Sequence, residues 1–315
     1  MALPAPRRPL ALLQDGAPDR WLVFADPPEE AARLVARRVD EVRPALAEAA
    51  RRVEAEGRWA VGFLAYEAAP AFDPALVVHG GAGAVPDERP PLLWLALVPP
   101  PAVVEAAAPP IAAGAYRCGD WRPSVDAAAY ARAVAEVRRR IERGDTYQVN
   151  YTYRLSSSFD GDPAGLVRDL AAAQGGAHGG FVDAGRHAVC CASPELFFAQ
   201  QDGAVTARPM KGTAPRGRWS AEDDARARAL AASPKERAEN LMIVDMMRND
   251  LGRVAVPGSV AVPELFAIER YPTVWQMTST VTARTAAPPV EVLAALFPCA
   301  SITGAPKAAT SAVIA

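Results

Sequence analysis

The fold is decided by residues 193–213, which read SPELFFAQQDGAVTARPMKGT. Asp202-Gly203 separates two runs rich in apolar and β-branched residues, and this arrangement is a strong short-range signal for a β-hairpin. Pro209 has no N–H to donate to a strand ladder, so it predicts a bulge or a strand end just before Lys211. The segment therefore predicts two antiparallel strands with an irregularity beside a lysine.

The register of this hairpin decides how Glu195 and Lys211 meet. A two-residue turn would pair Glu195 with Met210, whereas a three-residue loop would place Lys211 opposite Glu195 on the same face. One interpretation is a cross-strand surface salt bridge, which contributes little to stability. The apolar neighbours favour the alternative, a buried pair in which the amine acts as nucleophile or base and the carboxylate as its acid partner.

A helix with two glutamates follows the hairpin in the sequence. Residues 233–236 have the pattern of a capping box with proline at the first helical position, and Gly252 predicts the end of the helix. The run 240–244 is apolar nearly all round, which predicts a buried helix. Glu236 is explained as the cap partner, but Glu239, one turn further on, needs a partner if it is buried. An arginine and a hard cation such as Mg²⁺ are both candidates.

The segment before the hairpin predicts a helix and a two-faced strand. Residues 124–144 predict a helix with Ser124 as its N-cap and Gly144 as its stop. In residues 147–155 apolar side chains alternate with uncharged polar ones such as Gln148. This pattern predicts a strand whose polar face is either solvated or the wall of a hydrogen-bonding pocket.

The bulk properties exclude several functional classes. The chain has 315 residues, of which 50% are hydrophobic and 22% charged, and its net charge is −2. This balance predicts no general attraction to nucleic acid or to a membrane surface. The four cysteines have no metal-ligand spacing, which favours a reduced, cytoplasmic compartment. Residues 1–14 support neither a signal peptide nor a membrane span.

Two regions are expected, an amino-terminal region over residues 1–113 and a catalytic domain over residues 114–315. The first region is expected to contain strands at 21–24, 59–66 and 92–98, a helix near 28–56 and a linker at 98–113. No internal repeat is visible.

Four blocks in this order resemble the chorismate-utilising enzymes. The blocks are residues 193–198, 208–216, 237–245 and 301–307. A lysine directly before Gly212-Thr213 resembles one branch of the family, the aminodeoxychorismate synthase component I enzymes. Residues 62–69 resemble the front part of these synthases, including forms fused to aminodeoxychorismate lyase. The resemblance implies an α+β, anthranilate-synthase-like fold, with two mostly antiparallel sheets packed face to face and helices outside.

The resemblance also implies a role for each matching residue. Glu195 would be the general acid/base and Lys211 the nucleophile that attacks chorismate. Substrate contacts would come from Thr213, Gly212, Gln148, Gly304 and Ala305. Glu239 would bind the cofactor Mg²⁺, with Glu236 acting through water. The product would be 4-amino-4-deoxychorismate, on the route to p-aminobenzoate and folate, and a glutamine amidotransferase subunit would supply ammonia.

Single positions separate this branch from its relatives. The resemblance implies alanine in place of Lys211 in anthranilate synthases, and lysine in place of Gln148 in isochorismate and salicylate synthases. Many relatives have histidine where Trp275 stands, so this tryptophan is expected to pack rather than transfer protons.

The end of the sequence, Ala315, leaves three hypotheses open. Family members continue with a second metal glutamate and with a tyrosine and an arginine that hold the substrate carboxylates, so the chain is expected to be truncated with an incomplete site. It is then an aminodeoxychorismate synthase component, an inactive remnant that keeps the fold, or an anthranilate synthase with an unusual lysine.

Overall fold

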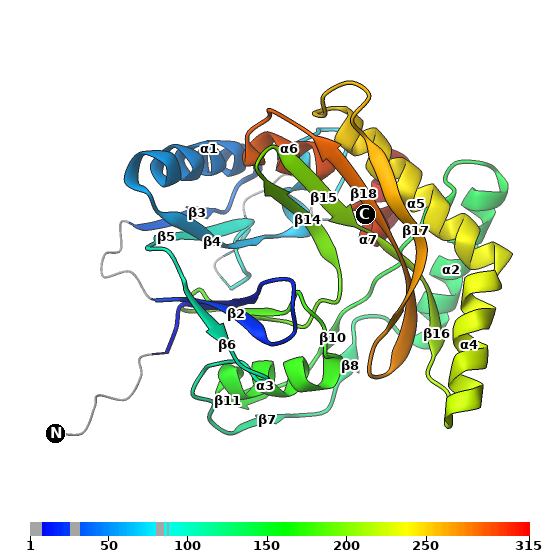
Figure 1. Cartoon of the computed structure of the whole chain (residues 1–315), viewed down its shortest axis with the longest axis horizontal. Coiled ribbons are helices and arrows are strands. Elements are labelled where there is room, and N and C mark those ends of the chain that lie inside the picture. Colours follow the sequence, from blue (N-terminus) through cyan, green and yellow to red (C-terminus); the bar gives the residue numbers. More distant parts are fainter. Residues whose placement is uncertain (1–7, 26–31, 80–84, 87) are drawn as a thin grey trace. The chain divides into compact units, whose positions relative to one another are not determined.

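The computed structural model describes residues 8–25, 32–79, 85–86 and 88–315 (Figure 1). These residues form two compact units whose segments alternate along the chain. Unit 1 is made of Met1–Ala71, Ala82–Arg122 and Ser157–Pro194, and unit 2 of Phe72–Gly81, Pro123–Ser156 and Glu195–Ala315. The expected boundary near residue 113 concerns sequence regions, which this division into compact units does not test, and it stays a prediction.

Two antiparallel sheets pack face to face in unit 1. The order of the larger is β13-β12-β1-β2-β6, and that of the smaller is β3-β5-β4. The larger contains β1 (Ala11–Gln14), β2 (Arg20–Phe24), β6 (Ala102–Glu105), β12 (Gly180–Asp183) and β13 (Ala188–Cys191); the smaller contains β3 (Arg33–Ala36), β4 (Trp59–Leu64) and β5 (Leu93–Val98). Phe24, Trp94 and Val182 belong to the apolar cluster that joins the two sheets. Burial of such side chains is the main source of stability in this layer.

Helices cover the outer faces of these sheets. Ala49 of α1 (Val39–Glu56) packs with Leu97 of the smaller sheet. Val167 of α3 (Pro163–Gln174) packs with Trp21 and Phe181 of the larger one. The unit also contains the 3₁₀ helix η2 (Tyr66–Ala71) and the paired strands β7 (Tyr116–Cys118) and β11 (Phe159–Gly161).

Unit 2 is built on a sheet around the long strand β18 (Val274–Arg284). Strands β15 (Ala204–Arg208) and β16 (Met210–Pro215) follow one another along one edge of β18, and β17 (Ala261–Arg270) pairs with the other. Strand β14 (Leu196–Gln201) pairs with β15. Among the described residues, β16 pairs only with β18, so Lys211 lies in the strand at the end of the order β14-β15-β18-β16.

The helix α5 (Pro234–Gly252) covers this sheet. Ile243 and Met247 are fully buried against side chains such as Val205 and Val281 of the sheet. The remaining elements of the unit are α2 (Ala127–Glu142), α4 (Ser220–Ala232), α6 (Pro289–Leu296), α7 (Ala300–Thr303) and α8 (Lys307–Ile314), with the short strands β9 (Gln148–Val149), β10 (Leu155–Ser156) and β19 (Gly304–Ala305); β8 (Arg122–Pro123) spans the boundary between the units.

The hairpin prediction is confirmed. Gln201 pairs with Ala204, and both turn residues have positive φ, 51° at Asp202 and 72° at Gly203, as a type I′ turn requires. The turn therefore has two residues, as one alternative predicted. The pairing of Glu195 with Met210 that this alternative implied is not kept, because the register shifts between Ala199 and Leu196 and Leu196 pairs with Arg208. The predicted irregularity is also present, because Pro209 separates β15 from β16 and the register shifts just after it.

Several sequence expectations need correction. The strand expected over 147–155 is limited to β9 and β10, with irregular chain between them. The expected linker at 98–113 contains β6, which pairs with β2. The helix expected near 28–56 begins only at Val39, after β3, and residues 28–31 lie outside the described residues.

The two helices of unit 2 that were predicted from periodicity also differ in detail. Asp126, not Ser124, caps α2 by accepting from the Ala129 N–H, and none of the residues of α2 is buried. Helix α5 is not buried all round, because Leu241 remains 50% exposed while Ile243 is buried. Periodicity located the helices but did not determine how much of each surface is covered.

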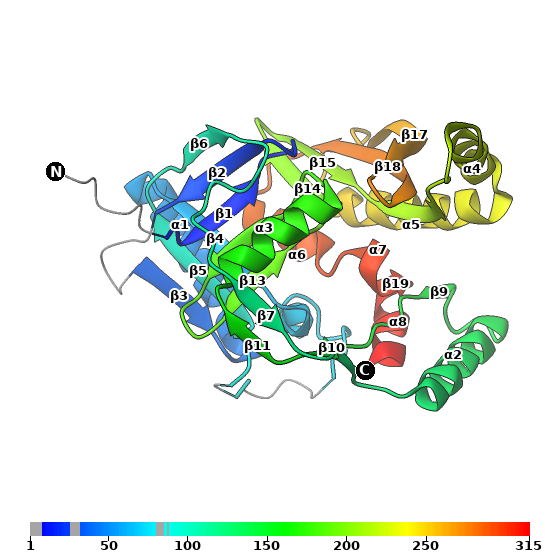
Figure 2. The same cartoon turned by 90° about the horizontal axis from the view of Figure 1, so that it is seen from below.

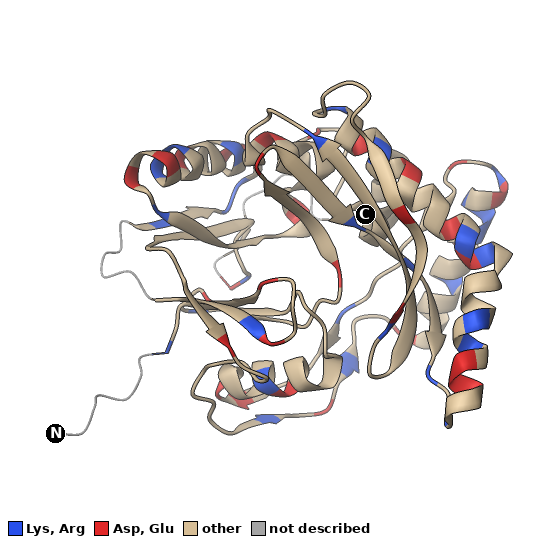
Figure 3. Ribbon diagram, viewed as in Figure 1, with Lys and Arg blue, Asp and Glu red and all other residues tan. Residues whose placement is uncertain are grey.

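The α+β class is confirmed, since strands of both units pair in antiparallel fashion and helices pack on the sheets. Acidic and basic residues are interspersed along α1, α4 and α5 rather than segregated by sign (Figure 3). In the part of the chain that the structure describes, no helix is both long and apolar enough to cross a bilayer.

Candidate functional site

Lys211 lies on a bulge of β16. The pairing of β16 with β18 shifts register between Met210 and Thr213, and Gly212 there has a φ of +101°. The bulge frees the carbonyl of Lys211 from the ladder, and the buried Asn240 of α5 donates its Nδ2–H to this carbonyl at 3.2 Å. A bulge commonly redirects a side chain next to an active site, and here it redirects the lysine.

The amine of Lys211 is partly buried and has a polar contact. Its Nζ donates to Oδ1 of Asn150 at 3.3 Å. Burial lowers the pKa of Lys211 because it disfavours the ammonium form, while the negative charges of Glu195 and Glu239 oppose this shift. A lysine whose pKa is lowered has more of the neutral, nucleophilic amine at a given pH.

Glu195, directly before β14, shows the opposite perturbation. Burial raises the pKa of its carboxyl group, and the hydrogen bonds from Ser301 and the Met210 backbone, with the charge of Lys211, oppose the rise. Oγ of Ser301 donates to Oε1 of Glu195 at 2.5 Å and lies 3.1 Å from the thiol of Cys299. The structure therefore brings Glu195 and Lys211 into one electrostatic environment, with the carboxyl favoured as an acid and the lysine as an amine.

Strands β9 and β19, whose positions Figure 2 shows, form a short ladder next to Asn150, the residue that contacts Lys211. Gln148 pairs with Ala305 and Val149 with Gly304, and the chain continues to Asn150, whose N–H donates to the Thr303 carbonyl at 3.0 Å. The structure thus brings Gln148, Gly304 and Ala305 together, and their contact with a substrate stays a prediction. A Cβ at Gly304 would lie 2.2 Å from the Gln148 carbonyl oxygen, so only glycine allows this approach.

Glu236 and Glu239 converge on one cation. Nζ of Lys235 lies 3.0 Å from Oε1 of Glu236 and 2.9 Å from Oε1 of Glu239. Glu236 is also close to the bulge, because a Cβ at Gly212 would lie 3.4 Å from its Oε2. Within the described ranges, no group of three or more His, Cys, Asp and Glu side chains could hold a metal. The two carboxylates are therefore a pair with an ammonium between them.

The expected capping role of Glu236 needs a correction. Ser233 does cap α5, accepting from the Glu236 N–H at 3.4 Å. In a capping box the backbone N–H of Ser233 would donate to the Glu236 side chain. Here the Ser233 N–H donates instead to the Leu230 carbonyl at the end of α4. The two helices follow each other without a spacer, which gives this N–H a backbone acceptor and leaves the Glu236 carboxylate available to a cation.

Thr213 and Trp275 differ in their environments. Thr213 is exposed and its hydroxyl donates to Oε1 of Gln276 across the strands at 3.0 Å. Trp275 donates its Nε1–H to Asp223 at 2.8 Å, and the guanidinium of Arg216 lies 4.9 Å from its ring centroid. Arg216 and Asp223 also form an ion pair. Trp275 therefore packs in a cluster with Arg216 and Asp223, as expected.

Three residues of the site were assigned no individual role from the sequence. Ser301 and Asn240 lie within the recognised blocks, and Asn150 lies on the polar face of the expected strand. The sequence signal that could have identified these three residues is their type, because a polar side chain inside an apolar run is usually buried with a hydrogen-bond partner. Which partner it contacts depends on the bulge and on the β9–β19 ladder, which are long-range features.

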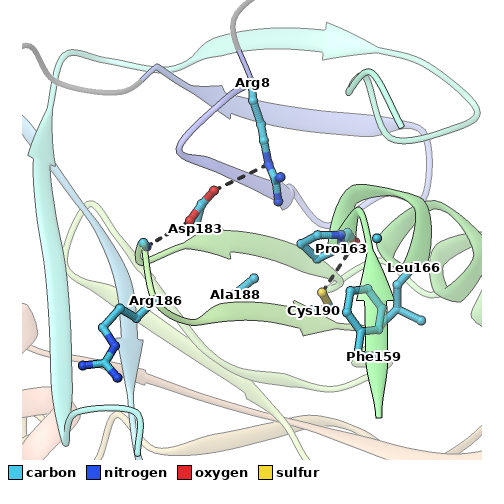
Figure 4. A pocket seen from close by; sticks show the side chains of 10 residues that line it. Arg8, Phe159, Pro163, Leu166, Asp183, Arg186, Ala188 and Cys190 are labelled. Atoms are coloured by element: carbon cyan, nitrogen blue, oxygen red, sulfur yellow. Dashed lines mark hydrogen bonds and ion pairs between the residues drawn. The ribbon is translucent and has the colours of Figure 1, made fainter. Parts of the chain in front are cut away.

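A separate cavity of about 450 Å³ lies in unit 1 (Figure 4). Arg8, Asp183 and Cys190 contribute to its lining, together with Phe159. The guanidinium of Arg8 is already paired with Asp162 at 3.1 Å and with Asp183 at 3.5 Å. None of the residues predicted from the sequence to be functional lines this cavity.

A fold of this class that places an activated amine, a buried acid and a carboxylate pair within one unit has the parts of an enzyme site for nucleophilic and acid–base chemistry. The family of chorismate binding enzymes matches residues 101–315 of the sequence. The chain belongs to this family.

Two named relatives and one solved structure show how far the likeness extends. Aminodeoxychorismate synthase component 1 of Klebsiella aerogenes is 42% identical over 213 residues, 67% of this chain and 47% of that protein. Anthranilate synthase component 1 of Streptomyces coelicolor is 38% identical over 203 residues, 62% of this chain and 39% of that protein. The chain thus spans about half or less of the length of these relatives.

The crystal structure of anthranilate synthase component I from Streptococcus pneumoniae matches with a TM-score of 0.71 and 20% identity, covering 100% of this chain and 78% of that chain. This likeness confirms the expected anthranilate-synthase-like fold.

Proposed function

We propose that this chain carries the chorismate-aminating site of an aminodeoxychorismate synthase component 1. The single observation that carries the proposal is the pair Lys211 and Glu195, a nucleophile and an acid whose pKa values burial shifts in opposite directions. Environments that displace two titratable groups in this way assign the acid and base roles of a site. The family and the similarity to named synthases supply the substrate, chorismate.

The reaction proceeds in two displacements. The neutral amine of Lys211 adds to C2 of the chorismate ring, the ring double bonds shift, and the C4–oxygen bond breaks. The proton of Glu195 passes to the departing hydroxyl, which leaves as water. Ammonia then adds at C4, the double bonds shift back and Lys211 leaves C2 as an amine. The surplus proton of the added ammonia returns to Glu195, so chorismate and ammonia give 4-amino-4-deoxychorismate and water.

The residues around the pair position the substrate. Asn150 holds the amine of Lys211 beside the Gln148 to Ala305 ladder, which we assign as the wall of the substrate site together with Gly304. Oε1 of Gln148 is buried and has no hydrogen-bond partner. A buried acceptor without a donor is costly, so we assign this oxygen to a hydrogen bond from a hydroxyl group of the substrate. Gly212 lets the bulge form, and Thr213 lies at the exposed end of the same site.

The donor set fits a Mg²⁺ ion. Glu236 and Glu239 direct carboxylate oxygens to one point that a cation already occupies, and Mg²⁺ is commonly bound by one or two carboxylates with water completing the shell. When bound, the ion would polarise a substrate carboxylate and make the conjugated ring more electrophilic. Glu239 would be the direct ligand and Glu236 would act through water.

The remaining assignments follow from the class of the named relatives. Ammonia would come from a glutamine amidotransferase subunit, the product would go to an aminodeoxychorismate lyase, fused or separate, and the enzyme would work in the cytoplasm. An anthranilate synthase is the second candidate, because a relative of that name matches almost as well; Lys211 favours the aminodeoxychorismate synthase.

The test is product analysis with the protein encoded by the full reading frame that contains these residues. Chorismate, ammonium and Mg²⁺ should give 4-amino-4-deoxychorismate by liquid chromatography and mass spectrometry. Lys211→Ala should lose this product, while Arg248→Ala, which removes an exposed cation from α5, should keep it. Unchanged turnover by Lys211→Ala would exclude covalent catalysis by the lysine, and anthranilate as the wild-type product would establish the second candidate.

A further inference from the structure

Lys235 stands where a bound cation would stand. Its Nζ contacts both carboxylates of the proposed metal site, at 3.0 Å from Glu236 and 2.9 Å from Glu239. The three residues share the first turns of α5, so one ammonium bridges the pair. The side chain of Lys235 is 72% exposed, whereas those of Glu236 and Glu239 are 22% and 36% exposed. The lysine therefore covers the pair from the solvent side and is free to leave it.

The position of Lys235 is unfavourable for a lysine on general grounds. It is the second residue of α5, where the positive end of the helix dipole disfavours a cation. Its pairing with Glu239 also has the lysine on the N-terminal side, which is the weaker orientation of an i,i+4 pair. An exposed ion pair contributes only about 0–1 kcal/mol to stability. Helix stability thus gives little reason for a lysine at this position. Its main contacts are the two carboxylates, Glu236 and Glu239.

We propose that Lys235 is a displaceable internal counter-ion of the Mg²⁺ site, which holds Glu236 and Glu239 together when no metal is bound and competes with the metal for them. This inference rests on the proposed function, since it takes the two glutamates to be metal ligands.

The distances from Lys235 to the two carboxylates show what must move when Mg²⁺ replaces the lysine. The carboxylate oxygens lie about 3 Å from the ammonium nitrogen, whereas Mg²⁺ requires oxygens at about 2.0–2.1 Å. Ammonium and metal cannot occupy the same point together, so Lys235 must swing out and the carboxylates must close by about 1 Å. While it remains, Lys235 prevents two neighbouring carboxylates from repelling each other. It therefore keeps the ligands in place and at the same time weakens metal binding.

The experiment measures metal affinity directly in the intact chain, without turnover. Mg²⁺ binding is measured by isothermal titration calorimetry, and Mn²⁺ binding by the loss of the free-ion electron paramagnetic resonance signal. Lys235→Met keeps the aliphatic length and removes the charge. It should bind both ions roughly 3- to 10-fold more tightly than the wild type, since two exposed ion pairs no longer compete. Lys235→Arg keeps the charge and should stay near the wild type.

The matched control is Arg248→Met on the same helix. Arg248 is exposed and paired with Asp245 at 3.1 Å, so this variant makes the same change in net charge away from the two glutamates. Its metal affinity should stay within about twofold of the wild type. Glu236→Gln combined with Glu239→Gln should remove the binding, which places the ion at this pair.

The outcomes separate this inference from the proposed function. Equal metal affinity in wild type and Lys235→Met, with binding lost in the double glutamine variant, would overturn the role of Lys235 and leave the metal site standing. Weaker binding in Lys235→Met would overturn it too and make the lysine a support of the site. Absence of metal binding in every variant would overturn both this inference and the metal assignment, while amination of chorismate would still decide the roles of Lys211 and Glu195.

Discussion

At the scale of single residues, Lys211 and Glu195 are the groups whose surroundings oppose their usual ionisation. Burial lowers the pKa of Lys211 and raises that of Glu195. Both shifts cost stability, because each group is held in an environment that disfavours its charged form. Such costs are typical of residues retained for function rather than for folding.

Replacing Lys211 by Met should stabilise the protein at pH 7. The pKa of Lys211 is lower in the folded chain than the value of about 10.4 in the unfolded chain. Between these two pKa values the unfolded chain binds more protons than the folded one. The free energy of unfolding of the wild type therefore increases as pH rises through that window. At pH 7 the cost of the buried ammonium is present, and Lys211→Met should raise the free energy of unfolding by about 0.5–2 kcal/mol. Urea denaturation at pH 7 and pH 9.5 tests this, with Arg248→Met as the control. A destabilised Lys211→Met variant would contradict it.

Removing the Ser301 hydroxyl should move the pH profile of the reaction. The Ser301 hydrogen bond favours the ionised form of Glu195 and so lowers its pKa; without it the pKa should rise further. Because the acid form of Glu195 is needed, activity falls as pH rises through this pKa, and in Ser301→Ala that fall should occur at higher pH. Ser301→Thr, which keeps a hydroxyl, should restore the wild-type profile. A basic limb that does not move in Ser301→Ala would remove Ser301 from the positioning of the acid.

At the scale of elements, the bulge in β16 and the short ladder of β9 with β19 place the site. The bulge needs Gly212, with its positive φ, and is held by Asn240 of the covering helix α5. The ladder needs Gly304, which approaches the Gln148 backbone. Gly212 therefore allows the bulge that carries Lys211, and Gly304 allows the close backbone approach in the ladder of β9 with β19.

Gly212→Ala should damage the site more than an equally strained glycine elsewhere. Its Cβ would lie 3.1 Å from Cβ of Met277 and 3.2 Å from Cβ of Glu236, at a φ that already disfavours alanine. We expect a loss of about 1–3 kcal/mol and a loss of activity, since the clash displaces Glu236 and the bulge. Gly258→Ala has a φ of +80° but open space around it, and should cost only the backbone strain with activity kept. Denaturation curves and product analysis compare the two; equal effects would show that the bulge does not depend on Gly212.

A buried ion pair fixes α8 to α5. Nζ of Lys307 lies 2.7 Å from Oδ2 of Asp250, and their side chains are only 11% and 6% exposed. Lys307→Met should cost about 3–5 kcal/mol, because it leaves a buried carboxylate without its counter-ion. The double variant with Asp250→Leu should recover most of this loss, since an apolar pair needs no counter-ion. Urea denaturation of the single and double variants measures both, and a single variant as stable as the wild type would show that the pair is not needed.

At the scale of the whole molecule, the sequence predicted the local turn, strand break and helix cap well. The turn at Asp202-Gly203, the break at Pro209 and the cap at Ser233 each follow from the chemistry of the residue itself. The α+β class and the family followed from the order of four blocks. The proximity of Glu195 and Lys211 was among the predicted alternatives because both lie on one hairpin.

What the sequence could not determine depends on partners far away in the chain. The strand expected over 147–155 is divided because its two ends pair with different segments: β9 pairs with Gly304-Ala305, more than a hundred residues later, and β10 pairs with β8. The role of Ser301 depends on where its loop meets Glu195, and the contact of Glu236 with Lys235 depends on a backbone acceptor at Leu230. Local propensity carries no information about such contacts.

The central claim, that Lys211 is a nucleophilic amine in a buried site, can be tested most directly through its pKa. Lysine occurs at only three positions, Lys211, Lys235 and Lys307, so competitive acylation of the folded chain over a pH series, read by peptide mass spectrometry, resolves each amine. Lys211 should titrate below the ordinary value of about 10.4 and below Lys235, whose pKa its hydrogen bonds to Glu239 and Glu236 raise. A pKa for Lys211 at or above that of Lys235 would contradict the account.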